Sequence, residues 1–287
     1  MERYCIPDIL NHWVRAVNNG ETSFNCNIDR MVKRDHSHFH MSETFKCHRY
    51  RIMQRAGAVH AAKDDLSLRR FVLGDTVERM VFAATDYVKA NIASYADYKF
   101  HYQIPVRLVQ FDLVGHLDLL IEFPDGSVDL WDVKSCLQSK IDYVKRGEKD
   151  ETYEGQVSAY RMGMALPDPD RTAFPGGVKI ANAGICYIEK GVLMTHPEIV
   201  SPGVQDKVLD DYNRLMLEWS RYQKDRIIPA EVPLERKAEH NRMKDGKRIK
   251  QPAGMYPNWA CDKRYCSLIA NCPAKLEWWA SHPNAAG

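Results

Sequence analysis

Two aspartates and a lysine occur in neighbouring strand-like segments whose residue types could hold a metal ion. Asp118 ends the segment 114–118 (VGHLD), and Asp132 and Lys134 lie in the segment 130–135 (LWDVKS). Side chains alternate along a strand, so residues 132 and 134 share one face. The Pro-Asp-Gly-Ser turn at 124–127 predicts a hairpin that brings the three polar groups together. Two carboxylates form a hard oxygen site suited to Mg²⁺ or Mn²⁺.

A lysine beside such a site would supply positive charge where a water is deprotonated or a phosphate gains negative charge. By itself, an Asp-x-Lys triplet often occurs by chance, and aspartates at strand ends are frequent. Here the triplet is interleaved with Trp131 and Val133. Unpaired charges in such an apolar strand would be costly without a ligand to bind, which favours the functional interpretation.

Three further side chains could belong to the same site. Gln156 and Tyr160 are four residues apart in an expected helix and so share a face, where they could hold a phosphate or orient a lysine. Alternatively, Tyr160 belongs to the core and Gln156 to the surface. Glu78, in a helical segment, could add a third carboxylate, or it could lie on a solvated face beside Arg79.

The elements that must position these residues follow from hydrophobic periodicity. Apolar residues recur at helical spacing from Leu68 to about Ile92, with Gly74 as a point where the helix could break. Residues 1–65 are polar and irregular. The order of the segments predicts an α/β fold built on a mixed sheet. The expected strands are 102–111, 113–123, 128–133, 178–189 and, after a turn at 190–191, 192–195; the further helices are 151–166 and 204–223.

The chain has 287 residues, 45% hydrophobic and 27% charged, which is typical of a globular protein. Its formal charge of +2 is too small to indicate a nucleic-acid binder by bulk electrostatics. An apolar run long enough for a membrane span is missing from the sequence, and the N-terminus lacks the pattern of a signal peptide. We therefore expect a cytoplasmic protein that does not bind membranes. In that reducing compartment, the eight cysteines favour metal ligation, catalysis or burial over disulfides.

The segment 235–250 is rich in lysine and arginine and has no apolar period. We expect a solvated loop there or, as a second choice, an arm that contacts a polyanion. The expected organisation is one compact domain with three parts. These are an N-terminal segment 1–66, a core 67–230 and a C-terminal segment 231–287.

Taken together, the motifs resemble the RecB-like branch of the PD-(D/E)xK nuclease superfamily. That branch carries, in order, helix G-x-x-x-[HE], strand G-x-x-D, strand D-x-K and helix Q-x-x-x-Y. The corresponding pairs here are Gly74 with Glu78, Gly115 with Asp118, Asp132 with Lys134, and Gln156 with Tyr160. Glu78 stands where many members carry histidine. The resemblance implies a restriction-endonuclease-like core, a mixed central β-sheet flanked by helices.

The cysteines extend the resemblance to the iron-sulfur exonucleases of this branch, which include CRISPR-associated RecB-like nucleases and the nuclease domain of AddB. Those proteins carry one early and three late cysteines, here Cys47, Cys261, Cys266 and Cys272. The resemblance implies a 4Fe-4S cluster that joins the N- and C-terminal segments. The first late spacing is C-x4-C, where the family has C-x2-C, and Zn²⁺ held by four thiolates is the alternative. The remaining cysteines, 5, 26, 136 and 186, are expected to be plain thiols.

The resemblance implies a metal-dependent DNA exonuclease acting on single-stranded ends, with replication or recombination proteins as possible partners. A phage-encoded member would work in the host cytoplasm. Glu78, Asp118, Asp132 and the backbone carbonyl of Val133 would hold Mg²⁺ or Mn²⁺. Lys134 would position and activate the attacking water, and Gln156 and Tyr160 would position the substrate and Lys134. The alternative from another class is a non-catalytic DNA-binding or scaffolding subunit with the same fold and a structural zinc or iron-sulfur site.

Overall fold

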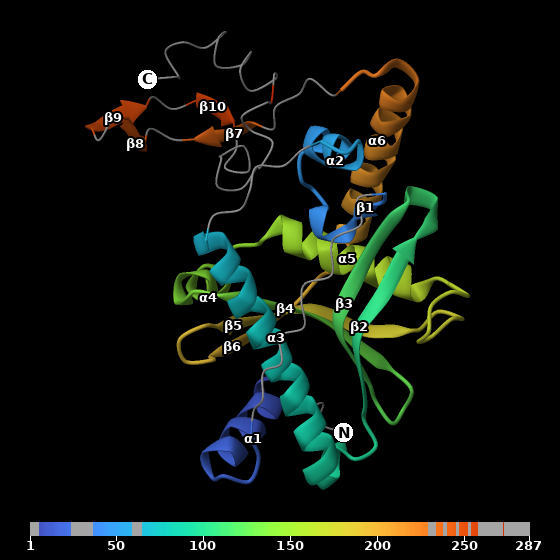
Figure 1. Ribbon diagram of the computed structural model, residues 1–287, viewed down its shortest axis with the longest axis vertical. Helices are drawn as coiled ribbons and strands as arrows, with labels where there is room; N and C mark the ends of the chain where they lie inside the picture. Colours follow the sequence, from blue (N-terminus) through green and yellow to red (C-terminus); the bar gives the residue numbers. More distant parts are fainter. Residues whose placement is uncertain are drawn as a thin grey trace. The chain divides into compact units, whose positions relative to one another are not determined.

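A computed structural model describes residues 6–23, 37–58, 65–228, 234–237, 240–244, 247–251, 254–257 and 272 (Figure 1). The chain divides into two compact units. The first comprises residues 1–45 and 63–213, and the second comprises residues 46–62 and 214–287. Each unit is described separately below. Short 3₁₀ helices at 41–43, 93–95 and 109–111 lie in the first unit.

The first unit is built on a six-stranded mixed sheet in the order β1-β3-β4-β5-β6, with β2 paired to the other side of β3. β1 with β3 and β4 with β5 run parallel, and the other neighbours run antiparallel. This confirms the expected α/β class and mixed sheet. The strands are β1 Phe39–His40, β2 Lys99–Leu108, β3 Leu113–Glu122, β4 Val128–Cys136, β5 Ile180–Glu189 and β6 Thr195–Ile199.

Helices cover both faces of the sheet. One face packs against α3 and α1, since Trp131 and Val133 of β4 share a buried cluster with Val77 and Val81 of α3. The other face carries α5, which Asp132 contacts. Alternate residues of β4 thus face opposite helix layers, as the two-residue period of a strand requires. The helices of this unit are α1 Ile6–Asn18, α3 Asp65–Asn91, α4 Gln138–Lys145, α5 Glu151–Ala165 and the first part of α6 Val204–Asp225.

Strands β3 and β4 separate beside the predicted site. Their ladder runs from Glu122↔Val128 to Leu119↔Trp131 and ends there, while β4 stays paired with β5 along its whole length. The next register position would join residue 118 to residue 132. We call this point, with Asp118 on one strand and Asp132 on the other, the fork. At the fork, the β3–β4 ladder leaves the position between Asp118 and Asp132 unpaired.

The buried side chains of β2 switch from one face of the sheet to the other at Gln103. Phe100 and Tyr102 pack against the cluster on the α3 side, but Val106 lies against Gly163 of α5. All three have even numbers, so a regular strand would direct them to one face. The change occurs at Gln103, whose φ is 48°, in the left-handed region. This single residue therefore lets β2 contribute buried side chains to both helix layers.

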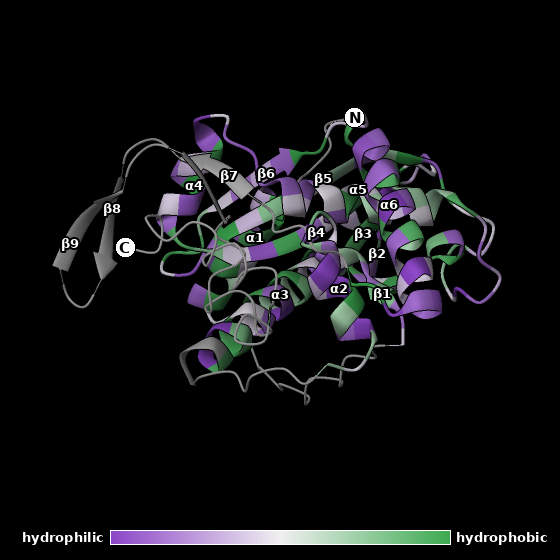
Figure 2. Cartoon of the chain, turned by 90° about the horizontal axis from the view of Figure 1, so that it is seen from above, coloured by the Kyte–Doolittle hydropathy of each residue, from purple (hydrophilic) through white to green (hydrophobic). Residues whose placement is uncertain are grey.

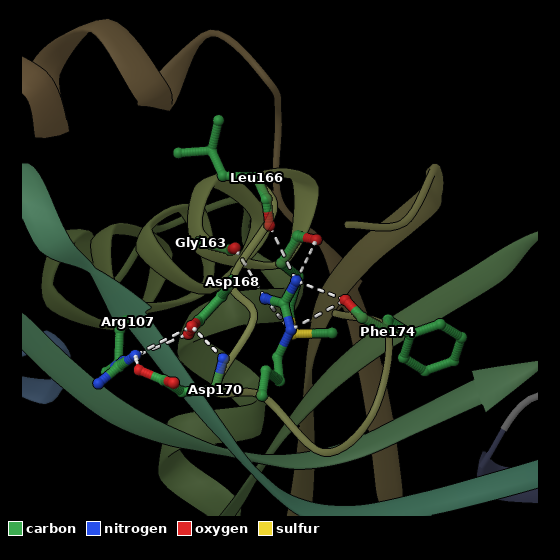
Figure 3. Close-up of polar contacts among 8 residues, drawn as sticks. Arg107, Gly163, Leu166, Asp168, Asp170 and Phe174 are labelled. Atoms are coloured by element: carbon green, nitrogen blue, oxygen red, sulfur yellow. Dashed lines mark hydrogen bonds and ion pairs between the residues drawn. The ribbon is translucent and has the colours of Figure 1, made fainter. Parts of the chain in front are cut away.

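The loop after α5 is fixed by a buried arginine (Figure 3). The guanidinium of Arg171 donates hydrogen bonds to the carbonyl oxygens of Gly163, Leu166 and Phe174 at 2.7–2.9 Å. These include carbonyls near the helix end, which lack partners within the helix. Next to it, Arg107 of β2 pairs with Asp168 at 3.0 Å and also contacts Asp170. The C-terminal end of α5 is thereby anchored to the sheet.

The second unit contains α2 His48–Arg55, the end of α6 and two antiparallel strand pairs, β7 with β10 and β8 with β9. His48 of α2 contacts Glu218 of α6 at 2.7 Å. The strands are β7 Leu234–Lys237, β8 His240–Lys244, β9 Lys247–Gln251 and β10 Gly254–Pro257. The expectation of a loop over 235–250 was therefore wrong. Backbone pairing of two strands does not require an apolar period. In the sequence, the Asp245-Gly246 dipeptide is of a type that favours hairpins and could have indicated one here.

Two other expectations also need correction. The N-terminal segment is not wholly irregular, because α1 buries Ile6, Ile9, Leu10 and Trp13 at helical spacing. Figure 2 colours the described elements by hydropathy, and both polar and apolar residues occur along the helices. Strand 192–195 instead begins at Thr195. Residues 190–194, which precede this strand, form a turn, because the Glu189 carboxylate accepts two backbone N–H groups and Leu193 has a left-handed φ of 57°. Within the described residues, we find no helix of the length and apolarity that crossing a bilayer demands.

Candidate active site

Asp118 and Asp132 face each other across the fork. One oxygen of Asp118, Oδ2, accepts a hydrogen bond from the backbone N–H of Val133 at 2.7 Å. The side chain thus takes the role that a strand carbonyl would have if β3 and β4 had stayed paired. Burial, together with the negative charges of Asp132 and Glu78, raises the pKa of Asp118 well above its usual value. The fork therefore concentrates carboxylates where a cation would relieve their repulsion.

Asp132 is fully buried and is paired with Lys134, two residues later on the same strand. Lys134 Nζ lies 2.8 Å from Asp132 Oδ2. Apart from this lysine, no described residue donates a hydrogen bond to that oxygen. Burial raises the pKa of Asp132, and Lys134 opposes that rise. For Lys134, burial lowers the pKa, but the charges of Asp132 and Asp118 outweigh burial and raise it overall.

Gln156 and Tyr160 of α5 cover the buried side of this pair. Gln156 Nε2 donates to Asp132 Oδ1 at 3.2 Å and to Tyr160 Oη at 2.9 Å. Both side chains are buried, so the alternative in which Gln156 is a surface residue does not hold. Burial and the neighbouring aspartates raise the pKa of Tyr160, which is therefore a neutral phenol. The amide fixes the orientation of the Asp132 carboxylate.

Glu78 of α3 reaches the site through a residue that the motifs did not indicate. Gln103 of β2 donates its side-chain amide to Glu78 Oε1 and, at 3.4 Å, to Asp118 Oδ1. Burial raises the pKa of Glu78 to about 7; the Gln103 hydrogen bond opposes this rise and the nearby charge of Asp75 adds to it. Glu78 thus belongs to the site's network and does not lie on a solvated helix face.

The donor set fits a hard divalent cation. Asp132 offers a buried oxygen whose neighbour among the described residues is the Lys134 ammonium, and Asp118 lies opposite, so two carboxylates are available. Mg²⁺ commonly takes one or two carboxylates and keeps several waters. As they stand, the described residues do not bring three His, Cys, Asp or Glu side chains close enough together to hold a metal ion. Direct ligation by Glu78 stays a prediction.

A second lysine lies beside the site, among tyrosines. Lys140 of α4 pairs with Asp150 at 2.7 Å and lies over three tyrosine rings. One of these rings, Tyr153 of α5, also lies 5.1 Å from Lys134 Nζ. Two ammonium groups therefore flank one aromatic ring next to the carboxylates. Sequence reasoning missed this arrangement because its members come from α4, α5 and β5 without any fixed spacing.

The predicted cluster cysteines are only partly described. Cys47 immediately precedes α2, and both Cys47 and Cys272 are half-buried and form no disulfide. Cys261 and Cys266 lie outside the described residues, so their ligation stays a prediction. Of the expected plain thiols, Cys186 is buried in the sheet and Cys136 ends β4, two residues after Lys134. Cys5 and Cys26 also lie outside the described residues.

Comparison with known proteins gives distant structural likenesses. No family model and no curated protein matches the chain. The alkaline exonuclease LHK-Exo from Laribacter hongkongensis is 10% identical with a TM-score of 0.44, over 66% of this chain and 93% of that chain. Its complex with dAMP gives 11% and 0.41 over the same shares. The structure of SSO0001 gives 11% and 0.44 over 94% of this chain and 95% of that chain. These likenesses assign no reaction, so the chemistry rests on the site's own geometry.

Proposed function

We propose that the protein is a metal-dependent deoxyribonuclease with a restriction-endonuclease-like core. It would hydrolyse phosphodiester bonds in DNA as an exonuclease on single-stranded ends, during replication, recombination or repair. The observation that carries this proposal is the fork, where Asp118 and Asp132 lie opposite each other and Lys134 Nζ lies 2.8 Å from a buried oxygen of Asp132. DNA as the substrate follows from the resemblance of the four ordered motifs to RecB-like nucleases.

Asp118, Asp132, the Val133 carbonyl and Glu78 would hold Mg²⁺ or Mn²⁺. When bound, such a cation polarises a phosphoryl oxygen and lowers the pKa of water. Hard oxygen donors are the ligands that these two cations prefer, which supports their assignment over softer metals. Burial, together with the negative charges of Asp75 and Asp132, raises the pKa of Glu78 to about 7, as is common for carboxylates in functional sites.

The protein's own residues prepare the site for an anionic substrate. Because the pKa of Lys134 is raised, its ammonium stays charged and can donate to the attacking water or to a phosphate oxygen. Gln156 keeps the Asp132 carboxylate in one orientation through its amide. Tyr160, held by the same amide, remains neutral and can donate its hydroxyl proton to a substrate oxygen.

We also propose that Cys47, Cys261, Cys266 and Cys272 bind a 4Fe-4S cluster. Cys47 and Cys272 are far apart in the sequence yet belong to the same compact unit, which supports a shared site. Metal analysis of anaerobically purified protein tests this proposal. A brown preparation with iron and acid-labile sulfide is expected, whereas a colourless preparation with one zinc per chain would favour four-thiolate zinc instead.

The nuclease proposal is tested by digestion of single-stranded DNA labelled at either end, with Mg²⁺ or Mn²⁺ and with EDTA. Asp132→Ala and Lys134→Ala should each abolish metal-dependent digestion while circular dichroism still shows a folded protein. Asp142→Ala and Lys145→Ala, exposed residues on α4, are matched controls and should digest normally. Undiminished digestion by Asp132→Ala would reject the assignment. Binding of DNA without any digestion by the wild type would favour a non-catalytic subunit.

A further inference from the structure

Gln103 has a backbone conformation that its residue type does not favour. Its φ of 48° lies in the left-handed region, although the flanking residues Tyr102 and Ile104 pair regularly with Leu119 and Leu117 of β3. A non-glycine residue with positive φ is uncommon and is held in place only when its surroundings demand it. Asn and Gly adopt this conformation more readily than Gln.

Packing explains the conformation but not the residue type. The change of sides in β2 coincides with the left-handed conformation of Gln103, and glycine would adopt that conformation with less strain. Gln103 is also exposed, so its side chain contributes little to the core. The choice of glutamine therefore needs an explanation in the contacts of its amide group.

Those contacts join two carboxylates from different elements. The one amide nitrogen has two hydrogens and faces Glu78 on α3 and Asp118 on β3. With Val133 N–H on Oδ2 and Gln103 on Oδ1, both oxygens of Asp118 have a donor. A carboxylate held at both oxygens keeps its plane and presents its remaining lone pairs in fixed directions. Asparagine, which is one methylene shorter, would not span the same two acceptors.

We propose that Gln103 is a positioning residue that holds Glu78 and Asp118 ready for a divalent cation. This inference rests on the proposed function, because it assumes that the fork binds metal. Partners that orient metal ligands typically contribute 10–100-fold to metal affinity. The strained backbone at Gln103 is then the cost of placing an amide donor between α3 and the fork.

Isothermal titration of metal-free protein with Mn²⁺, together with thermal melting in EDTA, tests the proposal. Gln103→Gly should raise the Kd for Mn²⁺ about tenfold or more, while the melting temperature of the metal-free protein stays equal or rises. Gln103→Asn keeps an amide and tolerates the same φ but lacks the reach, so it should show a similar loss of affinity. Gln110→Ala, which changes an exposed glutamine in the 109–111 turn, is the matched control and should leave both measurements unchanged.

The outcomes separate this inference from the proposed function. If both Gln103 variants bind Mn²⁺ as tightly as the wild type while Asp118→Asn binds none, Gln103 has no positioning role and the nuclease proposal stands. A fall in melting temperature with unchanged affinity would show that Gln103 is only structural. Wild-type protein that binds no Mn²⁺ would overturn both proposals.

Discussion

Lys134 Nζ lies 2.8 Å from the buried Oδ2 of Asp132, and the two residues occupy one face of β4. This ammonium is the positive charge placed among Glu78, Asp118 and Asp132, and each of these carboxylates has a raised pKa. In the metal-free protein, Lys134 therefore stabilises the site as well as preparing it for the reaction.

Replacing this lysine should make the protein's stability strongly dependent on pH. Lys134→Met should lower the free energy of unfolding by about 2–3 kcal/mol at pH 8, because it leaves buried carboxylates without a counter-charge. At pH 5, below the raised pKa of Glu78, the loss should be smaller. Urea denaturation at both pH values measures the difference, and Lys145→Met is the exposed control. An equal loss at both pH values would assign the effect to packing alone.

Asp118 has a structural role, because it accepts a hydrogen bond from Val133 N–H, and an electrostatic role, because it carries a charge. Two substitutions at this position distinguish the two roles. Asp118→Asn keeps an oxygen acceptor and removes the charge, so it should fold stably but lose Mn²⁺ binding. Asp118→Leu leaves the Val133 N–H without an acceptor and should be less stable than Asp118→Asn by about 1–2 kcal/mol. Denaturation of both variants in EDTA provides the comparison. Equal stabilities would mean that water satisfies the Val133 amide.

The raised pKa of Glu78 predicts how the stability of the metal-free protein varies with pH. In the folded state the pKa is about 7, against an ordinary 4.5. Between these values the folded protein binds more protons than the unfolded chain, so stability should fall as pH rises from about 4.5 to 7. Asp118 and Asp132, whose pKa values are also raised, act in the same direction.

Denaturation in EDTA at intervals from pH 4.5 to 8 measures this trend. Glu78→Gln should weaken the decline, whereas Glu151→Gln, an exposed glutamate on α5, should leave it unchanged. Saturating Mn²⁺ should offset the decline, since binding a cation favours the ionised carboxylates. A Glu78→Gln variant with the full wild-type decline would show that the two aspartates alone cause it.

Close packing of α5 on β2 predicts that a single methyl group would disturb the site. A Cβ at Gly163 would collide with Val106 Cγ1 and lie 3.1 Å from the Arg107 carbonyl oxygen. Gly163→Ala should therefore cost about 1–2 kcal/mol, even though alanine is the better helix former. It should also slow digestion, because the helix also carries Tyr160. Gly176→Ala, with open space around its Cβ, is the control. Improved stability of Gly163→Ala would mean that α5 can shift without strain.

The meeting of Asp118, Asp132 and Lys134 could be predicted from the sequence because it depends on local rules. Strand alternation fixes the relation of Asp132 to Lys134, and a hairpin turn brings Asp118 opposite. The burial of Gln156 and Tyr160 could not be settled in this way, because it depends on which face of the sheet α5 covers.

Gln103 was beyond sequence reasoning for a related reason. Its left-handed conformation arises where β2 passes from one helix layer to the other, and that choice is made by tertiary packing at Phe100 and Val106. Helix α1, by contrast, was within reach, because Ile6, Ile9 and Trp13 recur at helical spacing. The overall polarity of the first 65 residues hid that pattern.

The amide of Val133 has a consequence for spectroscopy. Its hydrogen is bonded to a side-chain carboxylate rather than to a strand carbonyl, so its chemical shift depends directly on the ionisation of Asp118. One resonance, from a backbone position that few substitutions would remove, would follow protonation and metal loading in the unmodified protein. The site thus contains its own spectroscopic probe of the charge on Asp118.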